Sequence, residues 1–141
     1  MKIFIVCSTS FYSRIKPIKE ELEKKNYEII LPNSYDESTT EHDYSNMTEE
    51  EYKLFFKEMY NLSRKKISEV DAILVLNFDK EKDGVVYKNY IGASTFLEMY
   101  EAFMQNKKIY MYNDYPNNML YDEIKGFNPT ILDGKIDKII L

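Results

Sequence analysis

The chemistry that this sequence could perform centres on Glu98. Residues 92–98 read GASTFLE, in which small residues lead into a predicted helix and place Glu98 in its first turn. Backbone N–H groups that lack partners at a helix N-terminus favour a negative charge, so we expect the Glu98 carboxylate to stay ionised. Such a carboxylate at the edge of a crevice can attack an electrophilic carbon. The anomeric carbon of a sugar is a suitable target, because it reacts through an oxocarbenium-like state.

Thr95 and Glu98 also have a simpler interpretation. A threonine followed three residues later by glutamate fits a capping box, in which both side chains bond the free N–H groups of a helix start. A capping box requires no function, and the residues alone favour it.

A second group of candidates follows the predicted strand at residues 3–6. Ser8 and Ser10 carry hydroxyls at the end of this strand and before a helix, where they could hold a phosphate or the polar edge of a base. Arg14 could add a charge-assisted contact. In the alternative interpretation, Ser10 or Ser13 merely caps the helix.

Three further candidates lie close to strand ends. Tyr12 could stack on a base, although aromatic side chains are more often part of a core. Asn77 and Asp79 follow the apolar segment 72–76, and we predict that Asn77 contacts the substrate. Asp79 could serve as a catalytic acid, or it could cap backbone groups where a loop begins.

The elements that must position these residues alternate along the chain. Pro17 fits the first turn of a helix that ends at Asn26, and Thr48 with Glu51 forms a capping box before a second helix. The apolar patterns predict strands at residues 3–6, 28–31, 72–76 and 109–112. They predict helices at about residues 16–26, 49–66, 93–106 and 120–125. We expect loops at 33–47 and 80–91, and a short strand or helix at 136–141.

This alternation predicts an α/β fold, namely a three-layer, Rossmann-like (flavodoxin-like) parallel sheet with helices on both faces. We expect residues 1–141 to form a single domain. Ligands of such sheets bind beyond the carboxyl ends of the strands. The loops 7–14, 77–94 and 113–119 should therefore converge on one crevice.

Composition excludes several classes of function. Nineteen basic and 24 acidic residues give a net charge of −5, which disfavours binding of nucleic acid through the overall charge of the protein. The apolar runs are too short for a membrane span, and the first residues become polar too early for a signal peptide. A single cysteine, Cys7, agrees with a reducing cytoplasm.

The sequence also predicts neither a cofactor nor a metal. It has no GxGxxG motif after the first strand and no GxxxxGK[ST] motif. Its one histidine, His42, lies between acidic residues, where we expect it to be solvated with a raised pKa. The spacing of the carboxylates is too irregular to indicate a metal site.

The segment around Glu98 resembles the nucleoside 2-deoxyribosyltransferases and the related deoxynucleotide N-hydrolases. The signature of that family is a small-residue turn, often Gly-Thr, followed by two residues and a nucleophilic glutamate. Residues 94–98 (STFLE) match it, with serine in the usual place of glycine. The order of strands and helices agrees over most of the chain.

The resemblance implies that Glu98 attacks C1′ of a (deoxy)nucleoside or its 5′-monophosphate, and that Gly92, Ser94 and Thr95 help to bind this substrate. A proton would reach the departing base from Asp79 or a tyrosine. The family usually has aspartate where this chain has Gly92, and glycine where it has Tyr100.

Two other classes of function stay open. The chain could be a non-catalytic nucleotide-binding or regulatory domain of the same fold, which the glycine at position 92 favours, or an interaction module without a small ligand. The resemblance further implies a homodimer or a larger homo-oligomer, with which the 13 tyrosines are compatible.

Overall fold

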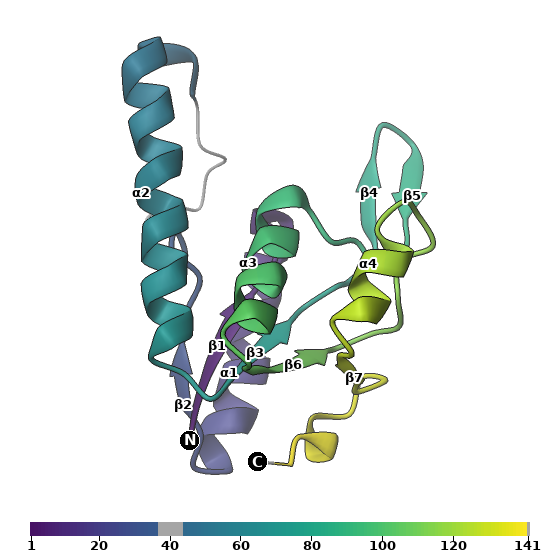
Figure 1. Cartoon of the computed structure of the whole chain (residues 1–141). Helices are drawn as coiled ribbons and strands as arrows, with labels where there is room; N and C mark the ends of the chain where they lie inside the picture. Colours follow the sequence, from purple (N-terminus) through teal and green to yellow (C-terminus); the bar gives the residue numbers. More distant parts are fainter. Residues whose placement is uncertain (37–43, 141) are drawn as a thin grey trace.

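A computed structural model describes residues 1–36 and 44–140 (Figure 1). His42 lies outside the described residues. The core is a parallel sheet in the order β2-β1-β3-β6-β7. Its strands are β1 Lys2–Val6, β2 Glu28–Ile30, β3 Ala72–Val75, β6 Lys108–Met111 and β7 Thr130–Ile131. The predicted α/β class with a parallel sheet is therefore confirmed.

Helices cover both faces of this sheet. A 3₁₀ helix at Thr9–Arg14 leads into α1 Ile15–Lys24, and the other α-helices are α2 Glu49–Ser68, α3 Ala93–Met104 and α4 Tyr121–Gly126. α1 packs on one face, together with the C-terminal 3₁₀ helix Ile136–Lys138. The end of α2, with α3 and α4, packs on the other (Figure 1). No described helix is both long enough and apolar enough to cross a bilayer.

The strands are apolar on both sides because both sides are covered. Ile3 and Ile5 point toward α1, while Phe4 and Val6 point toward α2 and α3, and all four are at most 1% exposed. This pattern is typical of a parallel strand between two helix layers.

The helix α2 extends well beyond the sheet. Its predicted cap is confirmed, because the Thr48 hydroxyl accepts a hydrogen bond of 3.1 Å from the backbone N–H of Glu51. Only the C-terminal half, with Ile67, reaches the core (Figure 1). The apolar stripe in the N-terminal half, which includes Tyr52 and Phe56, stays half-exposed or exposed.

Two segments differ from their prediction as loops. Residues 80–91 contain a hairpin of β4 Lys80–Lys82 and β5 Val85–Tyr87, joined by Asp83 and Gly84 at φ +53° and +77°. Asp-Gly with two positive φ values is typical of a two-residue hairpin turn. The prediction missed the hairpin because its strands are largely exposed and show no apolar alternation. In the other segment, residues 33–47, the Ser34 side chain is buried and a short 3₁₀ helix spans Tyr44–Asn46.

The chain after α4 adds a strand that was not predicted and a short terminal element that was. β7 was not predicted, because two residues that pair with Tyr110 and Met111 carry no recognisable periodicity. The short C-terminal element is a 3₁₀ helix at Ile136–Lys138, within the predicted segment.

Candidate functional site

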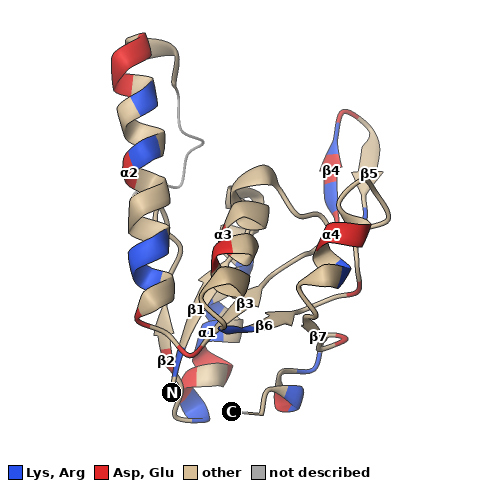
Figure 2. Cartoon of the chain, in the orientation of Figure 1, with Lys and Arg blue, Asp and Glu red and all other residues tan. Residues whose placement is uncertain are grey.

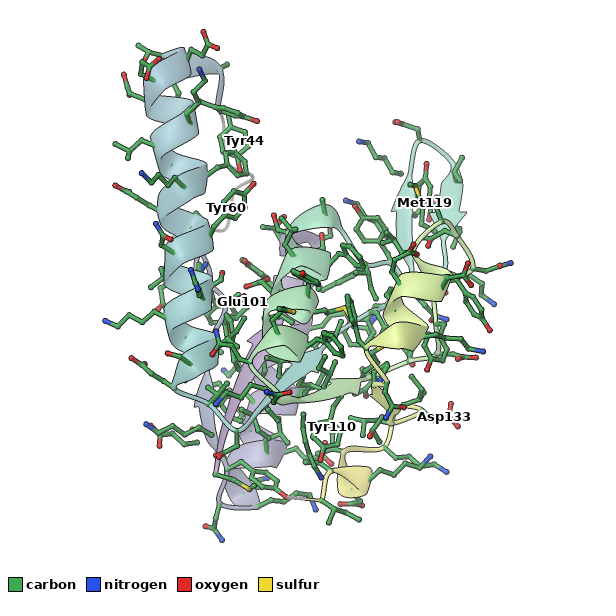
Figure 3. All side chains as sticks on the ribbon, in the orientation of Figure 1. Tyr44, Tyr60, Glu101, Tyr110, Met119 and Asp133 are labelled. Carbon is green, nitrogen blue, oxygen red and sulfur yellow. The ribbon has the colours of Figure 1, made fainter. Side chains whose placement is uncertain are left out.

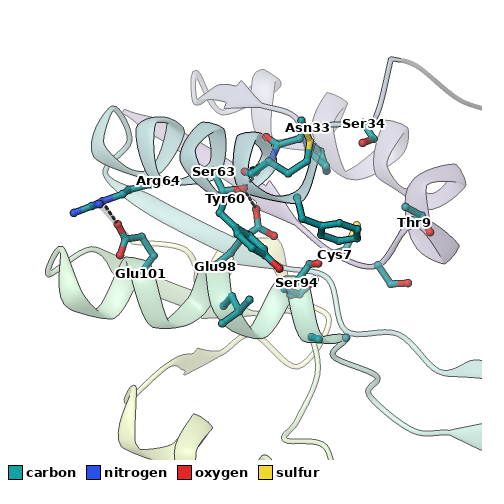
Figure 4. Close-up of a pocket in the computed structure, with 18 of the residues that line it drawn as sticks. Cys7, Thr9, Asn33, Ser34, Tyr60, Ser63, Arg64, Ser94, Glu98 and Glu101 are labelled. Atoms are coloured by element: carbon teal, nitrogen blue, oxygen red, sulfur yellow. Dashed lines mark hydrogen bonds and ion pairs between the residues drawn. The ribbon is translucent and has the colours of Figure 1, made fainter. Parts of the chain in front are cut away.

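A cavity of about 690 Å³ opens beyond the carboxyl ends of β1 and β2, between α2 and α3 (Figure 4). Its walls come from the segment after β1, the segment after β2, the middle of α2 and the start of α3. Hydroxyl groups and aromatic rings dominate the lining, which includes Ser8, Thr9, Tyr12, Ser34, Tyr44, Phe55, Phe56, Tyr60, Ser63, Ser94 and Thr95. This volume is in the range of about 300–1,000 Å³ that small-molecule sites occupy.

Glu98 lies in this cavity, in the second turn of α3 rather than in the predicted first turn. The helix begins at Ala93, and Gly92 is its N-cap, with an extended backbone and no side-chain cap. Thr95 is therefore inside the helix and buried, so the capping box of Thr95 and Glu98 is wrong. The half-buried Glu98 side chain instead crosses to α2, where its Oε2 accepts a hydrogen bond of 2.9 Å from the Ser63 hydroxyl (Figure 4).

Burial changes the acidity of Glu98. Removal of the carboxylate from water raises its pKa to about 7, against the opposing effects of the Ser63 hydrogen bond and the positive charge of Lys66. At neutral pH both protonation states of Glu98 are therefore populated. A carboxylic acid with a pKa in this range can act as nucleophile in one state and as proton donor in the other.

Asn33 supports Ser63 from the segment after β2. Its side-chain amide donates hydrogen bonds of 2.8 Å to the Ser63 hydroxyl and 3.2 Å to the backbone carbonyl of Met59. The Asn33 carbonyl oxygen is buried and has no hydrogen-bond partner among the residues that the structure describes. Asn33, Ser63 and Glu98 thus form a chain of hydrogen bonds across three elements.

The other charged groups near Glu98 have partners of their own. On the rim, the Arg64 Nε forms an ion pair of 2.9 Å with Glu101 (Figure 4). Lys66, whose pKa burial lowers, donates a hydrogen bond of 3.0 Å to the backbone carbonyl of Leu31. The described residues that line the cavity are uncharged apart from Glu98, Arg64 and Glu101.

Several predicted residues do meet in this cavity. Ser8, Tyr12, Gly92, Ser94 and Thr95 all line it together with Glu98. Ser8 also caps the 3₁₀ helix, because its hydroxyl accepts a hydrogen bond of 3.3 Å from the backbone N–H of Ser10. Burial raises the pKa of the Tyr12 hydroxyl, so Tyr12 keeps its proton at neutral pH.

Ser10 and Asp79 lie elsewhere. Both line a second, smaller hollow of about 390 Å³, together with Arg14. The Asp79 carboxylate accepts a hydrogen bond of 3.0 Å from the backbone N–H of Asn89, which is the capping contact of the simpler interpretation. The Arg14 guanidinium lies 3.5 Å from the centre of the Phe78 ring. The structure therefore does not bring Asp79 to Glu98.

Asn77 joins two strand ends inside the protein. It is fully buried, and its amide donates hydrogen bonds to the carbonyls of Asn113 and Asp114 at 3.1 and 2.8 Å. The side-chain carbonyl oxygen of Asn77 accepts a hydrogen bond of 2.8 Å from the backbone N–H of Asn113. The loop 113–119 does not line the Glu98 cavity, so the expected convergence of three loops is wrong for that loop.

Sequence reasoning missed the contribution of the segment after β2 and of α2. Asn33 follows a predicted strand just as Ser8 does, so the rule about carboxyl ends could have identified it. Ser63 continues the apolar stripe of α2, four residues after Met59, where a small polar residue is unusual. Within residues 1–36 and 44–140, no three histidine, cysteine or acidic side chains cluster as metal ligands would.

Comparison with known proteins gives structural neighbours only. No protein-family model and no curated protein matches the sequence. The CMP N-glycosidase BcmB of Clostridium botulinum matches with a TM-score of 0.52 and 15% identity over 93% of this chain and 85% of that chain. A 2-deoxyribosyltransferase of Bacillus psychrosaccharolyticus matches with a TM-score of 0.53 and 14% identity, over 86% and 81%. The chain therefore shares the fold of a nucleotide N-glycosidase and a nucleoside deoxyribosyltransferase, as the resemblance of residues 94–98 predicted.

Proposed function

We propose that this protein cleaves or transfers the N-glycosidic bond of a (deoxy)nucleoside or nucleoside 5′-monophosphate, with Glu98 as the nucleophile. The observation that carries the proposal is the place of Glu98, whose carboxylate faces a cavity of small-molecule size among hydroxyls and aromatic rings. The names of both structural neighbours describe enzymes that act at such a bond, which supports the same class of chemistry here.

In the first step, a Glu98 oxygen forms a bond to C1′ of the sugar. The bond between C1′ and the base nitrogen breaks, and its electron pair stays on the base. The transition state resembles an oxocarbenium ion, which the negative charge of Glu98 stabilises. Aromatic side chains of the cavity, such as Phe56 and Tyr60, offer faces on which the base can stack.

The departing base needs a proton. Asp79 lies outside the cavity, so we assign the proton transfer to a tyrosine of its wall. Tyr12 is our candidate because it lines the cavity and carries its proton at neutral pH, although burial raises its pKa and so weakens it as an acid.

In the second step, water or another base attacks C1′ and releases the sugar from the Glu98 ester. Water yields the free sugar, while a base yields a new nucleoside. The two structural neighbours are named for one outcome each, so both acceptors belong to the proposal. No cofactor takes part in either step.

The test is incubation with a panel of deoxynucleosides, ribonucleosides and their 5′-monophosphates, followed by chromatography for free or exchanged base. We expect one substrate class to release base, and Glu98→Gln and Glu98→Ala to abolish release. Glu58→Gln, an exposed glutamate of α2, is the matched control and should keep full activity. Unchanged turnover in Glu98→Gln would refute the assignment.

A non-catalytic nucleotide-binding domain is the second candidate. Gly92 favours it, because this position carries no carboxylate. A rise in melting temperature with nucleotide, without base release, would support that function. No response to either would favour an interaction module. The cytoplasmic location of the protein and its homo-oligomeric state remain predictions.

A further inference from the structure

We propose that Ser63 and Asn33 are positioning residues, which hold the Glu98 carboxylate in one orientation and fix the direction of the hydrogen bond that it accepts. The inference rests on the proposed role of Glu98 as nucleophile. It adds two residues, from α2 and from the segment after β2, that never need to touch the substrate (Figure 4).

The direction of the chain follows from its one fixed acceptor. The backbone carbonyl of Met59 can only accept a hydrogen bond, so the Asn33 side chain must turn its NH₂ group toward α2. The same NH₂ group donates to the Ser63 oxygen at 2.8 Å. Ser63 therefore already accepts one hydrogen bond, and its single hydrogen points to Glu98 Oε2 at 2.9 Å. A hydroxyl held in this way favours the ionised carboxylate.

The unpaired oxygen of Asn33 supports a functional purpose. This orientation leaves the buried Asn33 carbonyl oxygen without a partner among residues 1–36 and 44–140, which destabilises the folded state. Buried polar atoms in proteins are nearly always paired, and exceptions gather where function demands a particular geometry. Here the orientation of Asn33 that leaves its oxygen unpaired is the one that aligns the Ser63 hydroxyl with Glu98.

Other groups that face Glu98 act less directly. Lys66 attracts the carboxylate from α2 but has its own hydrogen bond to Leu31. On α3, Glu101 is paired with Arg64. Burial raises the pKa of the Cys7 thiol and of the Tyr12 and Tyr44 phenols, which also face the cavity. Tyr60 of α2 and Tyr100 of α3 line it as well. Among described residues, Ser63 makes the one direct hydrogen bond to the Glu98 carboxylate.

The experiment compares Ser63→Ala, Ser63→Thr and Asn33→Ala with the unmodified protein. The pKa of Glu98 is measured by ¹³C NMR of the glutamate carboxyl carbons, with the signal assigned by its loss in Glu98→Gln. Base release is measured across pH on the best substrate of the panel. Ser68→Ala, an exposed serine that bonds the Lys65 carbonyl on the same helix, is the control.

We expect Ser63→Ala to raise the pKa of Glu98 by about one pH unit, because it removes a donor to the charged form. The acidic limb of the pH profile should move up equally, with kcat reduced about fivefold at pH 7 and KM nearly unchanged. Ser63→Thr should restore both values, and Ser68→Ala should change neither. Asn33→Ala should shift the pKa in the same direction by less, and it keeps the test decisive if Ser63→Ala does not fold.

The possible failures are distinguishable. An unchanged Glu98 pKa in both Ser63→Ala and Asn33→Ala, in an active enzyme, would overturn the positioning role alone. Equal losses in Ser63→Ala and Ser68→Ala that track melting temperature would do the same. If the Glu98 pKa moves as expected while no substrate of the panel releases base, the glycosidase proposal fails, and with it the role in catalysis, although the hydrogen-bond chain is confirmed.

Discussion

At the scale of single residues, the Glu98 carboxylate lies half-buried between α2 and α3, and this position controls its ionisation. Loss of hydration raises its pKa to about 7, while Ser63 and Lys66 hold the pKa below the value that burial alone would produce. A nucleophile with such a pKa is ionised in only part of the molecules at neutral pH, which has consequences for both activity and stability.

The rate of base release should rise with pH through about 7 and reach a plateau above it, because only ionised Glu98 can attack C1′. The measurement is kcat/KM across pH on the best substrate of the panel. A rate that is constant from about pH 5 to about pH 8 would contradict the ionisation of Glu98 as the controlling step.

Glu98→Gln should stabilise the protein at alkaline pH. Between the ordinary pKa of 4.5 and about 7, the folded state binds a proton that the unfolded state has lost, so stability falls as pH rises through this range. The glutamine variant lacks this titration and should be more stable than the unmodified protein at about pH 8, by up to roughly 3 kcal/mol. Urea unfolding at about pH 4 and about pH 8 measures the difference, which should nearly vanish at the acidic value.

Asn77→Ala should destabilise the fold by about 2–4 kcal/mol. The substitution empties a fully buried position and removes the hydrogen bonds of Asn77 to the carbonyls of Asn113 and Asp114 and to the Asn113 N–H. Urea unfolding measures the loss. Asn117→Ala, at an exposed position of the same loop, should change stability by less than about 0.5 kcal/mol.

At the scale of elements, α2 serves two purposes along its length. Its C-terminal half packs on the sheet and delivers Ser63 to Glu98, its middle forms one wall of the cavity, and its N-terminal half extends past the sheet. Figure 3 shows Tyr44 and Tyr60 on the side of α2 that faces α3. The extended half has little core contact, so its helical structure depends on local interactions such as the Thr48 cap.

Thr48→Ala should loosen the start of α2 at a cost of about 1 kcal/mol, because it removes the acceptor for the Glu51 N–H. Hydrogen exchange should accelerate in the first turns of α2 and stay unchanged near Ile67. Thr48→Ser, which keeps the hydroxyl, should behave as the unmodified protein. Equal exchange in both variants would show that the cap does not hold this end.

The predicted elements agree best where each buries a face of its own. The runs at β1 and β3 and the periodic residues of α1 pack in the core, so their patterns identified them. The hairpin β4–β5 escaped prediction because it is largely exposed, and β7 because it is so short. Burial of apolar side chains is the signal that periodicity carries, and these strands lack it.

At the scale of the whole molecule, charges of both signs lie on α1, α2 and α4, whereas α3 carries acidic residues alone (Figure 2). Apolar side chains are nevertheless exposed on α2 and α3. Their exposed fractions lie between 42% and 55% for Tyr52, Leu54, Tyr60, Leu97, Tyr100, Phe103 and Met104. Exposed apolar surface of this kind often marks a protein–protein contact.

We expect the protein to form a homodimer or a larger homo-oligomer in solution, as the family resemblance implies. Light scattering should give at least twice the chain mass of 16.9 kDa. Tyr52→Glu places a charge in the aromatic stripe of α2 and should shift the population toward monomer, while Lys57→Glu at another exposed position of α2 should not. A monomeric mass for the unmodified protein would contradict this prediction.

The sequence by itself determined the buried strands, the main helices and the segment that carries Glu98, because each of these leaves a local pattern of apolar and small residues. Tertiary structure alone decided which polar groups meet that carboxylate. The strand order β2-β1-β3 brings Asn33 and Ser63 to Glu98, and the path of the chain after β3 carries Asp79 away. Periodicity records how deeply an element is buried but not which elements become neighbours, so the partners of Glu98 could not be read from the chain.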